Sequence, residues 1–289
     1  MATIEFCKFH GFGNDYIVVE EDDLTQVSDI GAVAKAMCHR HTGVGADGIA
    51  VVGPREEEDS DFHCRIFNPD GTEAGFSGNG TRCAVAYLYF KEIWTSDSLK
   101  LSTPSGNKEF SFKGRQGDAF SFVSRLGKPE FAAAKIPFSR DTVASDDPVV
   151  EFPIRLGVRK YEITCVNVGN PVCVIFTDNF EFNWRRIGRL LESEACFPER
   201  TNVVFVKVDS EDQVEIRIWE RGAGDTSSSG TCAIAAAIAS AYTGKTGREV
   251  NVVAPGGTTR TVWDEDDEMV IEGEAELAFC GQFSVLNRD

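Results

Sequence analysis

The chain has 289 residues, which is about twice the usual size of a single domain and therefore predicts two domains. Hydrophobic residues make up 42% of the sequence, enough to build sizeable cores. The formal net charge of −17 repels phosphate backbones and anionic lipids, which argues against nucleic-acid and membrane partners. No apolar run approaches the roughly 20 residues that span a bilayer. Residues 1–20 lack a secretory apolar block, so we expect a cytoplasmic protein.

Nine cysteines are scattered along the chain without CxxC pairs. Their odd number and spacing argue against a disulfide framework and against structural zinc, and they fit a reducing compartment. Cys7, Cys38, Cys64 and Cys165 stand among apolar residues, so we expect them to fill the core. The sequence contains neither a Walker A motif nor an HExxH motif, and we expect no metal and no organic cofactor.

Taken in chain order, segments rich in β-branched or aromatic residues and bounded by Gly, Pro, Asn or Asp predict strands. These segments are residues 4–9, 16–20, 49–52, 62–68, 161–168, 172–176, 201–208, 213–219 and 248–253. Amphipathic spacing predicts helices over residues 29–38 and 184–194. Residues 81–90 and 232–241 are nearly apolar throughout, which predicts two buried helices. A Gly and Pro cluster at residues 127–129 marks the expected crossover between the halves.

The two buried helices reveal an internal repeat. Residues 77–83 read Ser-Gly-Asn-Gly-Thr-Arg-Cys and lead into the first helix, whereas residues 229–232 read Ser-Gly-Thr-Cys and lead into the second. A Gly-Asn turn after a strand lies upstream of each, at residues 13–14 and 169–170. Repetition over this length predicts duplicated domains rather than a solenoid, whose period would be roughly 20–50 residues.

Both helix starts are suited to binding an anion. The first turn of a helix leaves backbone N–H groups without partners and carries partial positive charge. Gly78 and Asn79 in the first half, and Gly230 and Thr231 in the second, leave room for a carboxylate to approach these groups. A carboxylate gripped there would acidify its α-carbon, and racemisation then needs one proton-transferring group on each face. The alternative is that both glycine turns only cap helices.

Several segments, in order, resemble diaminopimelate epimerases over essentially the full chain. They are residues 10–16, 40–48, 68–73, 78–83, 169–171, 199–202 and 220–226. The resemblance implies an α+β fold of two pseudo-symmetric domains, each a mixed, barrel-like sheet around a central buried helix, with the active site in the cleft between them. It also implies a homodimer. We expect domains over residues 1–119 and 120–274, with residues 275–289 forming a strand that returns to the first domain.

The chain departs from this family at its acid–base groups. The two cysteines that transfer protons in the family correspond to Ser77 and Ser229 here. The family's Asn-Pro-His reads Asn-Pro-Val and ends at Val172, whereas the acidic partner remains as Glu220. A serine hydroxyl is a far weaker acid than a thiol, so it needs a strong neighbouring base. Cys83 and Cys232 lie on the same helices, and we expect both to be packing residues.

The residues that would bind the distal amino-carboxylate end of the substrate are all present. By resemblance they are Asn14, Asn68, Asn170, Asn202, Glu220 and Arg221. Arg221 suits bidentate carboxylate recognition, and asparagine amides can meet both amine and carboxylate groups. The alternative interpretation of Asn14 and Asn170 is turn formation beside Gly or Pro.

Three hypotheses therefore stay open. The first is a diaminopimelate epimerase that interconverts the LL and meso forms in lysine and cell-wall synthesis. The second is a related cofactor-independent isomerase with another amino-acid substrate. The third is a binding protein that keeps the pocket but performs no chemistry. The complete distal set favours the first over the second, and the loss of both thiols and the His favours the third over the first.

Overall fold

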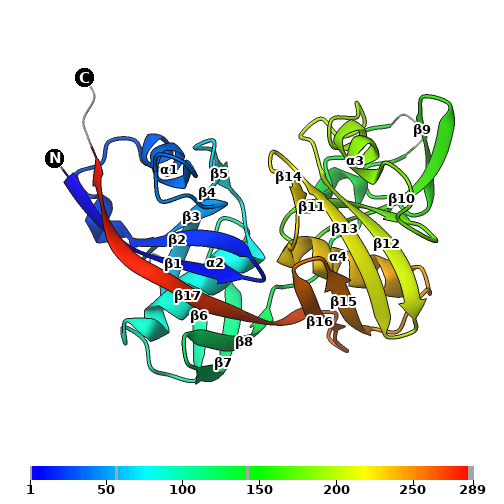
Figure 1. The fold of residues 1–289 in the computed structure, drawn as a ribbon. Coiled ribbons are helices and arrows are strands. Elements are labelled where there is room, and N and C mark those ends of the chain that lie inside the picture. The colour runs from blue at the N-terminus through cyan, green and yellow to red at the C-terminus, as the bar shows by residue number, and fades with distance from the viewer. Residues whose placement is uncertain (1, 56–57, 141–142, 286–289) are drawn as a thin grey trace. The chain divides into compact units, whose positions relative to one another are not determined.

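The computed structural model describes residues 2–55, 58–140 and 143–285, and the chain divides into two compact units (Figure 1). Unit 1 comprises Met1–Ser124 and Gly273–Asp289, and unit 2 comprises Arg125–Glu272. The domain limits expected from the sequence, after residues 119 and 274, stay a prediction. Among the described residues, no helix has both the length and the apolar character that a membrane span requires.

The described residues of unit 1 form eight long strands, a two-residue strand and two α-helices. The strands are β1 (Ala2–Gly11), β2 (Asn14–Glu20), β3 (Gly48–Pro54), β4 (Phe62–Phe67), β5 (Glu73–Ala74), β6 (Ser98–Ser102), β7 (Lys108–Gln116), β8 (Ala119–Arg125) and most of β17 (Met269–Val285). The helices are α1 (Ile30–Cys38) and α2 (Gly78–Phe90), with a 3-10 turn, η1, at Glu21–Leu24. Figure 1 shows β17, in red, running alongside β1.

Unit 2 repeats this organisation. Its strands are β9 (Phe152–Leu156), β10 (Arg159–Asn167), β11 (Pro171–Phe176), β12 (Asn202–Ser210), β13 (Gln213–Glu220), β14 (Gly224–Thr226), β15 (Glu249–Ala254) and β16 (Gly257–Trp263). Its α-helices are α3 (Trp184–Glu192) and α4 (Gly230–Tyr242), with a 3-10 turn, η2, at Ala133–Lys135. The beginning of β17 pairs with β16.

The strand pairing confirms the internal repeat. In unit 1, β1–β2 is antiparallel, β2–β3 parallel, β3–β4 antiparallel, β4–β6 parallel and β6–β7 antiparallel. In unit 2, the pairs β10–β11, β11–β12, β12–β13, β13–β15 and β15–β16 follow the same sequence of directions. A mixed sheet with few helices occurs in both halves, which confirms the predicted α+β class.

Helix α2 forms the centre of unit 1. Every one of the eight long strands of this unit sends at least one buried side chain into the core that surrounds the helix. All residues of α2 from Gly78 to Leu88 are buried, as expected for a helix that is apolar on all sides. Helix α4 is buried from Gly230 to Ser240 and packs against six strands of unit 2. The prediction of two buried helices is therefore confirmed, and each barrel-like sheet encloses one of them.

The amphipathic helices cover the outer faces of the sheets. Helix α1 packs Val33, Ala34 and Met37 against β1, β2 and β3. Helix α3 packs Trp184, Ile187 and Leu191 against β9–β12. Strands covered on both faces are buried almost throughout, as in β2 and β11, which explains why their sequences read as continuous apolar runs.

All nine predicted strands are present. Strands β6–β9 and β16 were not predicted, because polar residues interrupt these segments and each exposes one face. The short strands β5 and β14, of two and three residues, were not predicted either. Half-exposed antiparallel strands carry a weaker apolar signal than strands covered on both sides.

Cys7 is buried in the core of unit 1, as expected. It also forms a disulfide with Cys280, which the number and spacing of the cysteines did not predict. The two residues are separated by 273 positions and come together because β1 and β17 pair in the register Cys7–Cys280. Spacing along the sequence carries no information about this pairing. The other seven cysteines are free and buried.

Candidate active site

Ser77 caps the N-terminus of α2. Its backbone is extended, with φ −141° and ψ 120°, and its Oγ accepts a hydrogen bond from the N–H of Gly80 at 3.1 Å. This bond satisfies the third N–H of the helix and leaves those of Gly78 and Asn79 without an acceptor in the described part of the chain. The start of α2 therefore presents two free donors beside a half-buried hydroxyl group.

Ser229 caps α4 in the same way. Its backbone has φ −152° and ψ 120°, and its Oγ accepts a hydrogen bond from the N–H of Cys232 at 3.4 Å. The Oγ of Thr231 lies 3.3 Å from the same hydroxyl oxygen. Among the described residues, the N–H groups of Gly230 and Thr231 also lack an acceptor. Helices α2 and α4 thus begin in the same way, each with a capping serine and two backbone N–H groups that lack an acceptor among the described residues.

Tyr16, on β2, contacts the cap of α2 directly. Its phenol oxygen lies 2.8 Å from Oγ of Ser77. The ring fits only because Gly48 and Gly80 lack side chains: a Cβ at these positions would lie 2.6 Å and 2.9 Å from a ring carbon of Tyr16. Tyr16 belongs to the segment 10–16 that resembles the family, but nothing in the sequence predicts that it reaches Ser77.

A chain of polar side chains orients the amides of Asn14 and Asn79. Asn79 donates to Oδ1 of Asn14 at 2.9 Å, and Asn14 donates to Oδ2 of Asp47 at 2.8 Å. The fully buried Arg82 donates to Oδ1 of Asn79 and to the backbone carbonyl of Glu274. Both amides are therefore fixed in orientation, and each has a second N–H with no acceptor among the described residues.

The far end of this polar chain is an ionic cluster. Arg40 bridges Asp15 at 2.9 Å and Asp47 at 2.6 Å, and Lys8 lies 2.7 Å from Asp15. Burial opposes ionisation of Asp15, but the hydrogen bonds and charges of Arg40 and Lys8 outweigh it and lower its pKa. Burial and the neighbouring charge of Asp15 raise the pKa of Asp47. The cluster holds the carboxylate that orients Asn14.

Asn68 lies in a turn that follows β4. Its side-chain amide donates to Oγ of Thr72 at 2.9 Å, and its backbone N–H donates to the carbonyl of the same residue at 2.8 Å. Asn68 is half-buried. The structure therefore gives Asn68 a local role in the turn, and its side-chain carbonyl accepts no hydrogen bond from another described residue.

Glu220 and Arg221 stand at the end of β13. The N–H of Arg221 donates to Oδ1 of Asn202 at 2.9 Å, and its guanidinium donates to the carbonyl of Glu199 at 3.0 Å. Asn202 also donates to the carbonyl of Pro171 at 3.0 Å, so its amide ties three segments together. Burial lowers the pKa of Arg221.

Asn170 lies in the turn between β10 and β11, and Val172 is the second residue of β11. The carbonyl of Asn170 accepts the N–H of Val168 at 3.1 Å, and Gly169 has φ 97°, a conformation that favours glycine. Val172 is fully buried and pairs with Asn202 of β12. No titratable group occupies position 172.

The two cysteines near the helix caps are poor candidates for proton transfer. Burial raises the pKa of the Cys83 thiol to about 12. Burial, followed by the nearby charge of Glu220, raises the pKa of Cys232. Because the thiolate is the reactive form, both residues are inert packing groups at neutral pH.

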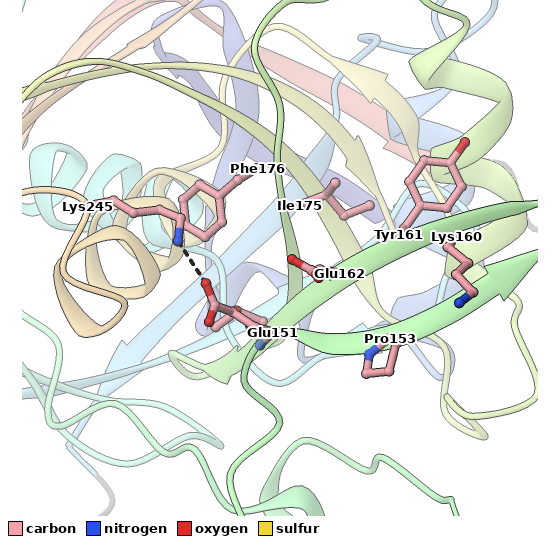
Figure 2. A pocket seen from close by; sticks show the side chains of 9 residues that line it. Glu151, Pro153, Lys160, Tyr161, Glu162, Ile175, Phe176 and Lys245 are labelled. Atoms are coloured by element: carbon pink, nitrogen blue, oxygen red, sulfur yellow. Dashed lines mark hydrogen bonds and ion pairs between the residues drawn. The ribbon is translucent and has the colours of Figure 1, made fainter.

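A separate groove lies elsewhere on unit 2 (Figure 2). Its volume is about 460 Å³, and it is lined by Glu151, Pro153, Lys160, Tyr161, Glu162, Thr164, Ile175, Phe176 and Lys245. Lys245 forms an ion pair with Glu151 at 2.9 Å across the groove. None of the expected site residues lines it. Lys245 follows the C-terminal end of α4, roughly 20 Å along the helix from its cap at Ser229.

Solved structures define the class of fold. A hydroxyproline epimerase from Agrobacterium vitis, with bound trans-4-hydroxy-L-proline, is 15% identical and superposes with a TM-score of 0.70, over 100% of this chain and 93% of that one. A phenazine biosynthesis protein from Bacillus anthracis is 17% identical, with a TM-score of 0.66 over 99% of this chain and 100% of that one. The chain thus shares its fold with both of these proteins.

Sequence comparison gives the family within this class. The profile of diaminopimelate epimerases matches residues 6–132 and 164–278. The diaminopimelate epimerase of Halothermothrix orenii is 36% identical over 286 residues, which cover 98% of each chain. That of Desulforudis audaxviator is 37% identical over 284 residues, covering 97% of this chain and 99% of the relative. The chain therefore belongs to the diaminopimelate epimerase family, a family of isomerases.

Proposed function

We propose that this protein interconverts LL- and meso-diaminopimelate by moving the proton at the α-carbon. The observation that carries the proposal is the pair of equivalent helix starts, each capped by a serine and each with two free N–H groups. Membership of the family and the complete set of distal residues support the same substrate. The proposal includes the setting that the resemblance implies, namely lysine and cell-wall precursor synthesis by a cytoplasmic homodimer.

The helix starts bind the reacting carboxylate in this proposal. Gly78 and Asn79 of α2, and Gly230 and Thr231 of α4, supply N–H donors at the positive ends of the helix dipoles. Donors aimed at a carboxylate stabilise the enolate-like charge that develops when the adjacent proton leaves. This stabilisation lowers the barrier to deprotonation without a metal or an organic cofactor.

Ser77 and Ser229 transfer the proton in this proposal, with Glu220 as the base that serves Ser229. A serine hydroxyl needs such help, because its unperturbed pKa lies far above that of a thiol. Asn14, Asn68, Asn170, Asn202 and Arg221 recognise the distal end of the substrate. Arg221 supplies the cation, and its N–H bond to Asn202 couples two members of the set.

One observation favours a second candidate function. Position 172 carries a buried valine where the family has its histidine, so the base at that position is missing. A protein of this fold without that base could bind diaminopimelate, or another amino acid, without epimerising it. In this alternative, the distal residues and the helix starts still form a binding site, but no proton is transferred.

Proton NMR of LL- and meso-diaminopimelate in D₂O tests the proposal. Loss of the α-proton signal above a protein-free control is the expected result. The double variant Ser77→Ala/Ser229→Ala is the matched control, and it must abolish the exchange while leaving binding measurable by calorimetry. Binding by the wild-type protein without exchange identifies the silent homologue. Absence of both binding and exchange refutes diaminopimelate as the substrate.

A further inference from the structure

Glu192, the last residue of α3, is a buried carboxylate with an unusual number of partners. Only 5% of the residue is exposed. Its Oε2 accepts a hydrogen bond from the indole N–H of Trp219 at 2.8 Å, and its Oε1 accepts one from the backbone N–H of Gly222 at 2.8 Å. The same Oε1 pairs with the guanidinium of Arg200. A buried charge persists only when it is paired in this way.

The partners of Glu192 bracket the turn that carries Glu220 and Arg221. Trp219 immediately precedes these two residues, and Gly222 immediately follows them. Gly222 has φ 80°, so the chain reverses there in a conformation that favours glycine. One carboxylate therefore fixes the chain on both sides of the turn.

Glu192 also fixes the segment that leads into Asn202. Arg200 has φ 63°, a left-handed conformation that is uncommon for a residue with a side chain, and its ion pair with Glu192 helps to hold it. The N–H of Thr201 donates to the backbone carbonyl of Glu192 at 3.3 Å. Asn202 follows directly and accepts the N–H of Arg221. Glu192 thus connects both chain segments on which the Arg221 position depends.

The close packing of α3 on β13 makes this arrangement rigid. A Cβ at Gly188, one helical turn before Glu192, would lie 2.7 Å from Cβ of Trp219. The glycine allows the helix to approach the strand closely enough for the Glu192 carboxylate to reach the indole. The side chain of Trp219 also packs against the buried cluster beneath α3.

We propose that Glu192 is a positioning residue for the active site: it does not touch the substrate, but it holds the Glu220–Arg221 turn in the orientation that binding and proton transfer require. The inference rests on the proposed roles of Glu220 and Arg221. Its structural part, the fixing of the turn, stands on the contacts of Glu192 alone.

The variant Glu192→Gln gives the sharpest test, because it is nearly isosteric. A glutamine has one acceptor oxygen, and its NH₂ group would face one of the two donors, Trp219 or Gly222. It also loses the ion pair with Arg200. Glu194→Gln is the matched control, because Glu194 lies two residues further on and pairs only with Arg140, at 3.1 Å, among the described residues.

We expect Glu192→Gln to weaken diaminopimelate binding at least about tenfold and to slow α-proton exchange further. Glu194→Gln should leave both unchanged. The indole N–H resonance of Trp219, assigned by its loss in Trp219→Phe, should shift in Glu192→Gln and not in Glu194→Gln. A folded Glu192→Gln protein with a shifted indole resonance but wild-type affinity and exchange would overturn the proposal.

Two further measurements keep the inference separate from the proposed function. If the wild-type protein does not bind diaminopimelate, the amide of Gly222 still reports on the turn by hydrogen exchange. Glu192→Gln must accelerate that exchange at least about tenfold, and an unchanged rate overturns the positioning role. If Glu192→Gln does not fold, Trp219→Phe removes one of the bonds to the carboxylate and keeps an aromatic, though smaller, ring at this position. Trp219→Phe must also accelerate hydrogen exchange at the amide of Gly222, by a smaller factor than Glu192→Gln.

Discussion

The hydroxyl group of Ser77 lies between two groups that can donate to it: the phenol oxygen of Tyr16 is 2.8 Å from Oγ, and the N–H of Gly80 is 3.1 Å away. When Tyr16 donates, both lone pairs of the serine oxygen are engaged and its own proton points away from the protein donors. The same two donors stabilise the oxygen once that proton has moved to a substrate. Tyr16 is therefore placed to assist Ser77 in the proposed proton transfer.

Tyr16→Phe should lower α-proton exchange about tenfold or more and leave diaminopimelate binding nearly unchanged, because it removes a donor to Ser77 without removing the ring. Exchange in D₂O and calorimetry measure the two effects. Tyr89→Phe is the control, since the Tyr89 hydroxyl donates to the carbonyl of Ser96, away from the cap. Equal exchange rates in Tyr16→Phe and wild-type protein would contradict a role for the phenol.

If the proposed reaction is right, introducing the groups that the sequence resemblance implies for the family should raise the exchange rate. Ser77→Cys/Ser229→Cys replaces two very weak acids with thiols whose pKa a helix N-terminus lowers further, so a gain of at least tenfold is expected. Adding Val172→His supplies the missing base, but it places an imidazole at a fully buried position and should lower thermal stability. No gain in either variant would mean that the scaffold serves another substrate.

Arg221→Ala should weaken diaminopimelate binding by a factor of about 10–100, because a charge-assisted hydrogen bond to the distal carboxylate is lost. The effect is expected whether or not the protein turns the substrate over. Calorimetry measures the affinity for diaminopimelate. Arg159→Ala is the control, because Arg159 is an exposed arginine at the start of β10. Wild-type affinity in Arg221→Ala would remove Arg221 from the distal site.

The cysteines should show three levels of reactivity toward a thiol reagent at pH 8. None of the seven free thiols should react quickly in the folded protein, because all are buried, and burial raises the pKa of Cys83 to about 12. Seven thiols should react after denaturation without reductant, and nine after reduction. Nine reactive thiols before reduction would show that Cys7 and Cys280 are not bonded in the isolated protein.

Asp15 should stabilise the protein in a pH-dependent way. Its folded pKa lies below the ordinary value of 3.8, since the bonds from Arg40 and Lys8 outweigh burial. Its contribution is therefore present above about pH 4 and is lost as the pH falls through the folded value. Asp15→Asn should cost about 1–3 kcal/mol at pH 7, and the difference in Tm from wild type should narrow toward pH 3. A constant difference would contradict the ionic role.

Local patterns determined the elements of this protein. Apolar runs and their bounding turn residues predicted strands such as β2 and β11, because strands buried on both faces need apolar side chains throughout. A serine before an apolar helix is a local signal for an N-terminus, so Ser77 and Ser229 could be recognised as the positions that precede α2 and α4. The repeat of this signal predicted the duplicated domains.

Only the tertiary structure decided which side chains meet. Tyr16 and Ser77 are 61 residues apart, and their contact depends on two glycines that admit the ring. Glu192 reaches Gly222, 30 residues further along, because α3 packs closely on β13. Cys7 and Cys280 pair because the first and last strands align in one register. Such contacts follow from strand pairing and helix packing between distant segments. Composition, spacing and periodicity describe only local stretches of the chain, so they do not predict these contacts.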